Sequence, residues 1–127
     1  MKVILDTNFL LIPYKFGVDI FSEIERVCVF NHELFIVDKT RYELDNIVKF
    51  QKGKDKDAAK LAISLLQSKN VGEVATSQDK IVDDLIVDLA EKEEIVVATN
   101  DKELIQRLKG KAKVLYLKSK KYLNLGG

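Results

Sequence analysis

The residue types that carry catalysis by thiol or imidazole are almost absent from this chain. Its 127 residues include one cysteine (Cys28), one histidine (His32), one proline and no tryptophan. A single cysteine excludes an internal disulfide framework and any multi-thiolate zinc or iron–sulfur site, and a single histidine excludes paired-histidine metal sites. None of the six glycines is spaced as GxGxxG or GxxxxGK, so there is neither a dinucleotide fingerprint nor a P-loop. The remaining chemistry belongs to carboxylates, hydroxyls, amides and lysines.

Long apolar runs are also missing. No stretch approaches the ~18 consecutive apolar residues that cross a membrane, and no signal-peptide pattern opens the chain, so we expect a cytoplasmic protein with no membrane partner. Hydrophobic residues make up 46% of the chain and charged residues 32%, which is typical of one globular domain. By size scaling it buries roughly two-thirds of its unfolded surface. Cys28 and most of the four tyrosines are predicted to be core or boundary residues, and His32 a surface residue.

The charges nearly cancel but are not evenly mixed. With 21 basic and 20 acidic residues, the formal net charge is +1. Lysines are concentrated at 49–60 and 109–121, whereas 79–94 is rich in acids. Lysine-rich stretches are usually solvated surface, yet these two could also contact phosphates.

Short apolar runs alternate with helical periodicity along the chain. The predicted strands are 2–5, 34–37, 71–75, 95–99 and 114–117. The predicted helices are 20–27, 40–50, 58–67, 79–92 and 101–109, and an earlier helical pattern is broken near Pro13 and Gly17. Strands that alternate with helices indicate βαβ units, right-handed crossovers and a parallel sheet, so we predict a single α/β domain.

Two acids follow strands of the predicted sheet. Asp6 closes the first strand, and Asp101 follows the strand that ends at Thr99. Because sites of parallel sheets lie outside the carboxyl ends of the strands, both acids fall where a site is expected. Each also has a structural interpretation. Asp6 is placed to cap a helix, and an acid at Asp101 suits the dipole of its helix. Glu103 would then be the partner of a cap at Asn100.

Glu43 faces the hydrophobic side of its predicted helix. On a helical wheel it falls between Ile47 and Phe50, on the apolar face. A carboxylate facing the core needs a partner, because burial of an isolated charge costs several kcal/mol. The alternative is a capping box, since Thr40-x-x-Glu43 has that spacing.

The adjacent acids Asp83 and Asp84 are separated by the same geometry. Asp83 lies over Ile86 and Ala90, on the shoulder of the buried stripe of its helix. Asp84 lies on the solvent side. Asp83 is therefore the acid that could reach a site beneath the helix, although an ordinary boundary acid would have the same position.

Four carboxylates in one cleft would repel one another, and a divalent cation would relieve that repulsion. Mg²⁺ and Mn²⁺ prefer carboxylate oxygens together with several waters. Such a site suits hydrolysis of a phosphodiester, because a bound ion lowers the pKa of the attacking water and stabilises charge on the scissile phosphate. No covalent nucleophile is required, which agrees with the scarcity of cysteine and histidine.

The segments around these acids resemble the motifs of the PIN domain family of metal-dependent ribonucleases. The similar segments are Val3-Ile4-Leu5-Asp6-Thr7-Asn8, Glu43-Leu44, Asp83-Asp84-Leu85-Ile86 with Ala90, and Val97-Ala98-Thr99-Asn100-Asp101-Lys102-Glu103-Leu104. The resemblance runs from Val3 to about Leu117, so we expect a domain at 1–117 and a basic tail at 118–127, whose order the sequence leaves open. It implies a three-layer α/β/α sandwich around a central parallel sheet of about five strands.

The resemblance also implies an endoribonuclease that uses Mg²⁺ or Mn²⁺ and acts on RNA. The residues it assigns to catalysis and metal binding are Asp6, Glu43, Asp83 and Asp101. Asn8 and Thr99 are expected to orient those carboxylates or their waters. The lysines expected to hold the RNA backbone are Lys52, Lys54, Lys56, Lys111 and Lys113. A homodimer is also expected, because dimerisation is frequent in the family.

Several alternatives remain open. Archaeal PIN proteins of ribosomal RNA processing look closest in the segment 98–104 and would place the chain in a processing complex. VapC-type toxin ribonucleases share the four acids and would add an antitoxin partner. A non-catalytic RNA-binding scaffold would bind RNA through the lysines with steep salt dependence and would not cleave it. Haloacid dehalogenase-type phosphatases need a second aspartate where this chain has Asn8.

Overall fold

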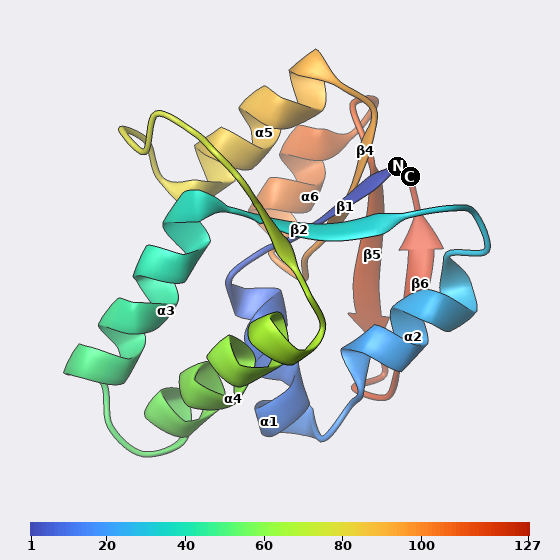
Figure 1. The fold of residues 1–127 in the computed structure, drawn as a ribbon. Coiled ribbons are helices and arrows are strands. Elements are labelled where there is room, and N and C mark those ends of the chain that lie inside the picture. Colours follow the sequence, from blue (N-terminus) through green and yellow to red (C-terminus); the bar gives the residue numbers. More distant parts are fainter.

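The structure, a computed structural model, describes all 127 residues and contains one sheet covered by helices on both faces (Figure 1). The strands are β1 (Lys2–Leu5), β2 (Glu33–Val37), β3 (Gly72–Val74), β4 (Ile95–Ala98), β5 (Lys113–Lys118) and β6 (Tyr122–Gly126). Their order across the sheet is β3-β2-β1-β4-β5-β6. The first five strands pair in parallel, and β6 pairs antiparallel with β5. The predicted α/β/α sandwich is confirmed, with a sixth, antiparallel strand added at one edge.

Helices fill both layers outside the sheet. They are a short 3-10 helix η1 (Asn8–Leu11), α1 (Ile12–Phe16), α2 (Ile20–Val27), α3 (Asp38–Phe50), α4 (Lys54–Ser68), α5 (Val82–Lys92) and α6 (Lys102–Leu108). The helices η1, α1, α2 and α4 pack on one face, while α5 and α6 pack on the other (Figure 1). Helix α3 contacts α4 and contributes to the first of these layers. None of the helices combines the length and the apolar character needed to cross a lipid bilayer.

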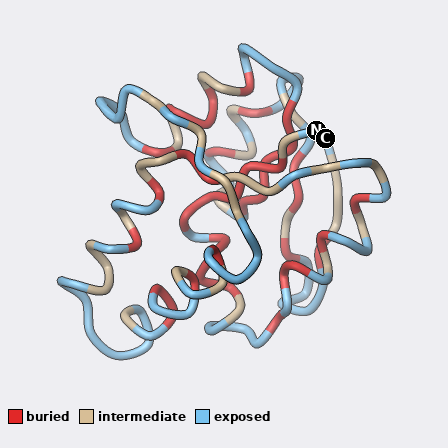
Figure 2. Tube along the Cα trace, in the orientation of Figure 1, coloured by how far each residue is buried: buried red, intermediate tan, exposed pale blue.

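Strand β1 lies between β2 and β4 in the sheet, which separates the two hydrophobic clusters of the core. Buried segments gather at the centre of the molecule (Figure 2). Val3 and Leu5 point into the larger hydrophobic cluster, whereas Ile4 points into the smaller cluster on the opposite face. All three side chains are fully buried, as expected for a central strand whose two faces are both covered. This burial fixes the position of Asp6, which follows the strand directly.

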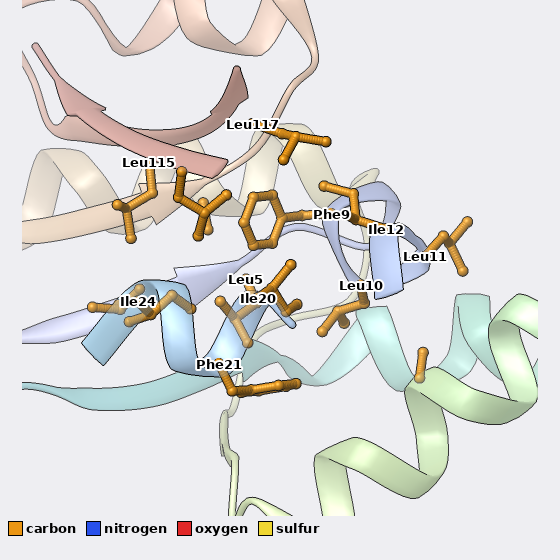
Figure 3. Packing of buried hydrophobic residues seen from close by; sticks show 14 of the residues in the cluster. Leu5, Phe9, Leu10, Leu11, Ile12, Ile20, Phe21, Ile24, Leu115 and Leu117 are labelled. Carbon is orange, nitrogen blue, oxygen red and sulfur yellow. The ribbon is translucent and has the colours of Figure 1, made fainter. Parts of the chain in front are cut away.

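Phe9 anchors the chain just beyond that aspartate. Figure 3 shows its ring between Leu5 and Leu117, within the larger cluster. Phe9 is fully buried, and burial of a side chain of this size contributes about 1.5–3 kcal/mol. The turn at residues 6–8 is therefore held from both ends, by β1 before it and by Phe9 after it.

A loop held by Asp38 precedes α5. The helix predicted to begin at residue 79 begins at Val82, because residues 75–81 adopt an irregular path. The Asp38 carboxylate accepts hydrogen bonds from the backbone and hydroxyl of Thr76 and from the amide of Gln78. Since Asp38 is in the first turn of α3, these bonds tie the start of α5 to the start of α3.

The residues predicted as a basic tail form an ordered hairpin. Lys118 pairs with Tyr122 across a turn in which Ser119 and Lys120 have φ of 56° and 55°. Leu123 of β6 is 1% exposed and belongs to the larger cluster. Residues 122–126 are thus part of the sheet and of the core.

The burial of the cysteine, the histidine and the tyrosines agrees only in part with the predictions from the sequence. Cys28 is 3% exposed, which confirms it as a core residue. The prediction of a surface position for His32 is wrong, because its side chain is 8% exposed and its Nδ1 lies 2.9 Å from the carbonyl oxygen of Phe30. The prediction that most tyrosines are core or boundary residues is also wrong. The exposed ones are Tyr14, Tyr42 and Tyr122.

Candidate active site

One cavity at the carboxyl ends of β1 and β4 collects the four acids named from the sequence. Its volume is about 510 Å³. The residues that line it are Asp6, Thr7, Asn8, Glu43, Asn46, Ile47, Ile81, Val82, Asp83 and Asp101. The acids arrive from four separate elements: the end of β1, α3, the first turn of α5 and the start of α6. Their convergence is thus produced by the sheet order, which places β1 beside β4.

Asp6 is the most buried of these acids, at 3% exposed. Its Oδ1 accepts the backbone N–H of Thr7 at 2.8 Å, and its Oδ2 accepts the hydroxyl of Thr99 at 2.8 Å. The pKa of Asp6 is raised to about 6, mainly by burial and also by the charges of Asp83 and Asp101, against the lowering effect of the two hydrogen bonds. The interpretation of Asp6 as a helix cap is wrong, because η1 has no side-chain cap.

Thr99 connects two of the carboxylates. It is fully buried, donates its hydroxyl proton to Asp6 and accepts the backbone N–H of Asp101 at 3.0 Å. Asp101 in turn caps α6, because its Oδ1 accepts the backbone N–H groups of Glu103 and Leu104. Its Oδ2 is in no hydrogen bond, so one oxygen of Asp101 holds the helix and the other is available to the cavity.

The cap predicted at Asn100 is therefore wrong by one residue. The Asn100 side chain lies beside Leu117 of β5 instead. Its amide donates to the Leu117 carbonyl at 3.1 Å, and its oxygen accepts the Leu117 N–H at 2.7 Å. These two bonds mimic a strand partner and fix the chain between β4 and α6, just before Asp101.

Glu43 enters the cavity from the second turn of α3. This helix begins at Asp38, so Thr40 lies inside it and the predicted capping box is wrong. Glu43 Oε1 instead accepts the hydroxyl of Thr7 at 2.6 Å. The Thr7 hydroxyl is also 3.2 Å from that of the fully buried Thr40, and a hydroxyl has one proton. We infer that Thr40 donates to Thr7 and Thr7 donates to the carboxylate.

Asp83 has no hydrogen-bond partner in the protein and is half-buried in the first turn of α5. Burial raises its pKa, the charge of Asp101 adds to the rise, Arg107 opposes it, and Glu43 adds a smaller effect. The neighbouring Asp84 points elsewhere and forms an ion pair with Arg107 at 2.8 Å. The geometry that separated the two adjacent acids in the sequence thus holds in the fold.

The sequence identified the acids better than it identified the residues that hold them. Thr99 contacts Asp6, whereas Asn8 lines the cavity but makes no hydrogen bond to any of the four acids. Thr40 was not among the expected site residues, and Thr7 was expected beside Asp6 but not in contact with Glu43. The sequence does place a threonine near an acid in both segments, at 6–7 and at 40–43. That local pattern cannot show that the two segments contact each other in the fold.

The set of donors suits a hard divalent cation that keeps several waters. Every polar side chain that reaches the cavity offers oxygen or an amide, and both oxygens of Asp83 and one each of Glu43 and Asp101 are free of hydrogen bonds. No three His, Cys, Asp or Glu side chains are arranged to hold one ion directly. Mg²⁺ commonly binds through one or two carboxylates plus waters, and the residues fit that mode.

The five lysines expected to hold the RNA backbone do not share one surface. Lys52 and Lys54 are exposed at the junction of α3 and α4 and form no ion pair, and Lys56 is half-buried in the first turn of α4. Lys111 and Lys113 lie at the amino end of β5, where they line a separate cavity of about 340 Å³. That end of the sheet is opposite the acids, so the structure does not bring these last two lysines to the candidate site.

Two archaeal proteins are similar to nearly the whole chain. Ribonuclease VapC4 of Methanocaldococcus jannaschii is 32% identical over 130 residues, which cover 99% of this chain and 97% of that protein. Ribonuclease VapC9 of Archaeoglobus fulgidus is 30% identical over 120 residues, which cover 93% of this chain and 84% of that protein.

The fold is also similar to a solved structure. The PIN domain endonuclease Utp24 superimposes with a TM-score of 0.80 over 98% of this chain and 90% of that chain, at 23% sequence identity, a level that shows the fold alone. The sequence model of a family described as "PIN like domain" matches residues 3–120. Because that match spans almost all of the chain and includes all four acids, the chain belongs to the PIN-like domain family.

Proposed function

We propose that this protein is a divalent-metal-dependent endoribonuclease that hydrolyses phosphodiester bonds of RNA. The observation that carries the proposal is the cavity into which four separate elements deliver Asp6, Glu43, Asp83 and Asp101. Two features support it further: burial and mutual repulsion raise the pKa of Asp6, and the two archaeal relatives are named ribonucleases.

The carboxylates would hold Mg²⁺ or Mn²⁺ at this cavity, partly through water. When bound, the ion lowers the pKa of the attacking water and neutralises charge on the scissile phosphate. Asp83 offers two free oxygens, while Thr7 orients Glu43 and Thr99 orients Asp6. Asn8, which lines the cavity with a free amide, is placed to orient a water or the substrate.

The decisive test is the cleavage of a labelled RNA in Mn²⁺ by the wild type and by Asp6→Asn and Asp83→Asn. Both variants should lose cleavage. Asp88→Asn is the matched control, because Asp88 is on the same helix as Asp83 but pairs with Lys80 outside the cavity. Its cleavage should be unchanged.

Metal binding supplies a second readout that does not depend on activity. An ion bound only by the folded protein raises its midpoint of thermal unfolding, and this rise should be much smaller in Asp6→Asn than in the wild type. Cleavage that survives Asp6→Asn, or a metal-free variant that does not fold, would count against the assignment.

Among ribonucleases, the comparisons favour a VapC-type enzyme. Both archaeal relatives have that name, and the similarity to each covers more than nine-tenths of this chain. As a toxin it would arrest growth when expressed alone in a heterologous host, and Asp6→Asn would not. Normal growth with an active wild-type enzyme would favour RNA processing instead. Sedimentation of the purified chain, alone and with a candidate antitoxin or processing partner, tests the proposed homodimer and partner complexes.

The alternative to an enzyme is a scaffold protein that binds RNA without cleaving it. It predicts RNA binding without cleavage in Mg²⁺ or Mn²⁺, and an affinity that does not change when an acid of the cavity is neutralised. The free oxygens of Asp83 argue against it, because an unpaired half-buried carboxylate would repel the phosphates that such a surface binds.

A further inference from the structure

Asn46 and Phe50 continue along α3 the row of side chains that Glu43 begins. At 100° per residue, Glu43 and Phe50 point within about 20° of each other, roughly 10 Å apart along the helix axis, with Asn46 between them. Asn46 lines the acid cavity, and its amide makes no hydrogen bond in the protein. Phe50 is the last residue of the helix and is 69% exposed.

Phe50 is exposed, as Tyr42 is, whereas the aliphatic residues of α3 are covered. Leu44 is fully buried, and Ile47 and Val48 pack against the larger cluster, because α4 covers that side of the helix. The sequence pattern groups Phe50 with the apolar face that contains Glu43. The structure leaves its ring in solvent one turn beyond Asn46 and Ile47, the last residues of α3 that line the cavity.

Positive charge accompanies this ring. The Nζ of Lys49 lies 5.4 Å from the centroid of Phe50, and the exposed Lys52 and Lys54 follow where the chain turns into α4. None of the three lysines forms an ion pair. An aromatic face beside free lysines is the arrangement by which proteins hold single-stranded nucleic acid, since bases stack on rings while the phosphates meet the cations.

We propose that Asn46 and Phe50 form a base-binding subsite for single-stranded RNA next to the carboxylates. Phe50 stacks on one unpaired base, and the Asn46 amide, which has both a donor and an acceptor, hydrogen-bonds to the edge of a base closer to the cavity. Lys49, Lys52 and Lys54 contact phosphates of the same strand. This inference rests on the proposed function, because it takes the carboxylates as the place where the strand is cut.

A second phenylalanine and lysine pair provides a matched control on another surface. Phe16 is 45% exposed, and the Nζ of Lys120 lies 5.8 Å from its ring centroid. Both residues line a different cavity, together with Lys121, Asp19 and Glu23. The two carboxylates offset the charge of the two lysines there, and this cavity is separate from the four acids, so Phe16 should not contribute to the binding of RNA at the candidate site.

The test measures the affinity of uncut RNA, so that it does not depend on catalysis. Fluorescence anisotropy would compare, in Mg²⁺, the Asp6→Asn protein with the double variant Asp6→Asn/Phe50→Ala, using a labelled single strand and an abasic strand of equal length. Phe50→Ala should weaken binding of the normal strand roughly five- to a hundredfold and leave the abasic strand unchanged. In the same Asp6→Asn background, Phe16→Ala should change the affinity of neither strand. Asn46→Ala removes the amide that contacts a base edge, so it should reduce the differences in affinity among poly(A), poly(C), poly(G) and poly(U).

Three results would overturn the inference: an equal effect of Phe50→Ala on both strands, no effect on either strand, or a change from dimer to monomer in sedimentation without a change in RNA affinity. The last result would assign the exposed ring to a contact between protein chains. If the wild type fails to cleave RNA in Mn²⁺ while the dependence on Phe50 remains, the proposed function fails and the subsite stands. If the wild type cleaves RNA and the affinity does not depend on Phe50, the proposed function stands and the subsite fails.

Discussion

Among single residues, Asp6 links the stability of the protein to pH. Its pKa rises from an ordinary 3.8 to about 6 in the fold, because the carboxylate is buried near Asp83 and Asp101. Between about pH 4 and pH 6 the folded protein keeps a proton that the unfolded chain has released. The free energy of unfolding therefore falls as pH rises through this window, and the cost of about 3 kcal/mol is complete above pH 6.

The corresponding prediction compares the wild type with Asp6→Asn without metal. The variant has no charge to bury, so it should be the more stable protein above pH 6 by up to about 3 kcal/mol, and the gap should close near pH 4. Urea unfolding in a chelator at several pH values between 4 and 7 measures both curves. Curves that remain parallel over this range would show that Asp6 does not titrate as proposed.

The hydroxyl of Thr99 joins Asp6 to Asp101, and its contribution can be tested by substitution. Thr99→Val keeps the shape of the side chain but leaves Asp6 Oδ2 and the Asp101 N–H without their partner, so it should cost about 1–3 kcal/mol of stability and lower the rate of RNA cleavage. Thr99→Ser keeps the hydroxyl and should restore most of both. Urea unfolding and RNA cleavage rates of the two variants test the role of the hydroxyl. Equal stability and equal cleavage rates of Thr99→Val and Thr99→Ser would contradict it.

The chemistry of single residues was predictable from the sequence only where local geometry decides it. Helical periodicity separated Asp83 from Asp84, and the structure keeps that separation. Asp101 was placed in the first turn of its helix but caps it in place of Asn100, because the Asn100 side chain bonds to Leu117 of a later strand. A contact with a distant segment decided the cap, and no local pattern contains it.

At the scale of elements, β6 converts the end of the chain into part of the core. Leu123 is 1% exposed, its N–H donates to Glu23 and its carbonyl accepts from Arg26, so the strand is bound to α2 as well as to β5. We expect Leu123→Ala to cost about 2–5 kcal/mol, and Leu125→Ala, at a partly buried position, to cost less. Chemical denaturation measures both, and a negligible effect of Leu123→Ala would argue that β6 is not part of the cooperative fold.

The strand β6 was missed because its turn lacks the usual sequence signal. Tight hairpin turns with positive φ are normally marked by glycine or asparagine, whereas here Ser119 and Lys120 adopt that conformation. The buried strands β1 and β4 were predictable because their apolar runs end at polar residues. The late start of α5 was not, since the bonds that Asp38 makes to residues 76 and 78 connect segments far apart in the chain.

The exposure of Phe50 has a similar cause. The periodicity of α3 placed it on an apolar face, but only part of that face is covered, because α4 packs on the side of Leu44. Which part of an amphipathic helix a neighbour covers depends on tertiary packing. The sequence thus predicted which acids could meet and left open what surrounds them.

For the whole molecule, the two ends of the sheet differ in charge and so should differ in their contacts with RNA. The acid cavity lies at the carboxyl ends of the strands, and Lys52 and Lys54 follow α3, the helix that carries Glu43, whereas Lys111 and Lys113 line the cavity at the amino end of the sheet. Replacing both Lys52 and Lys54 by alanine should lower the slope of log affinity against log salt by about 0.7 per lysine, the value for a single strand. The same change at Lys111 and Lys113 should leave the slope as it is.

That comparison is made by titrating one labelled RNA at several salt concentrations. A slope that responds equally to both pairs of lysines would mean that RNA wraps around the molecule or binds at more than one place. A response from Lys111 and Lys113 alone would place the strand at the amino end of the sheet and would separate RNA binding from the carboxylates.

The first and last residues of the chain lie next to each other (Figure 1), and both line the cavity at the amino end of the sheet. A purification tag, a fluorescent protein or a surface linker joined to Met1 or to Gly127 would therefore extend away from the carboxylates. A molecule immobilised through either terminus presents its acidic mouth to the solution, which makes single-molecule observation of a tethered copy practicable. The same proximity would let a short peptide join the old ends while new ones are opened in a surface loop, giving a circularly permuted form with the site intact.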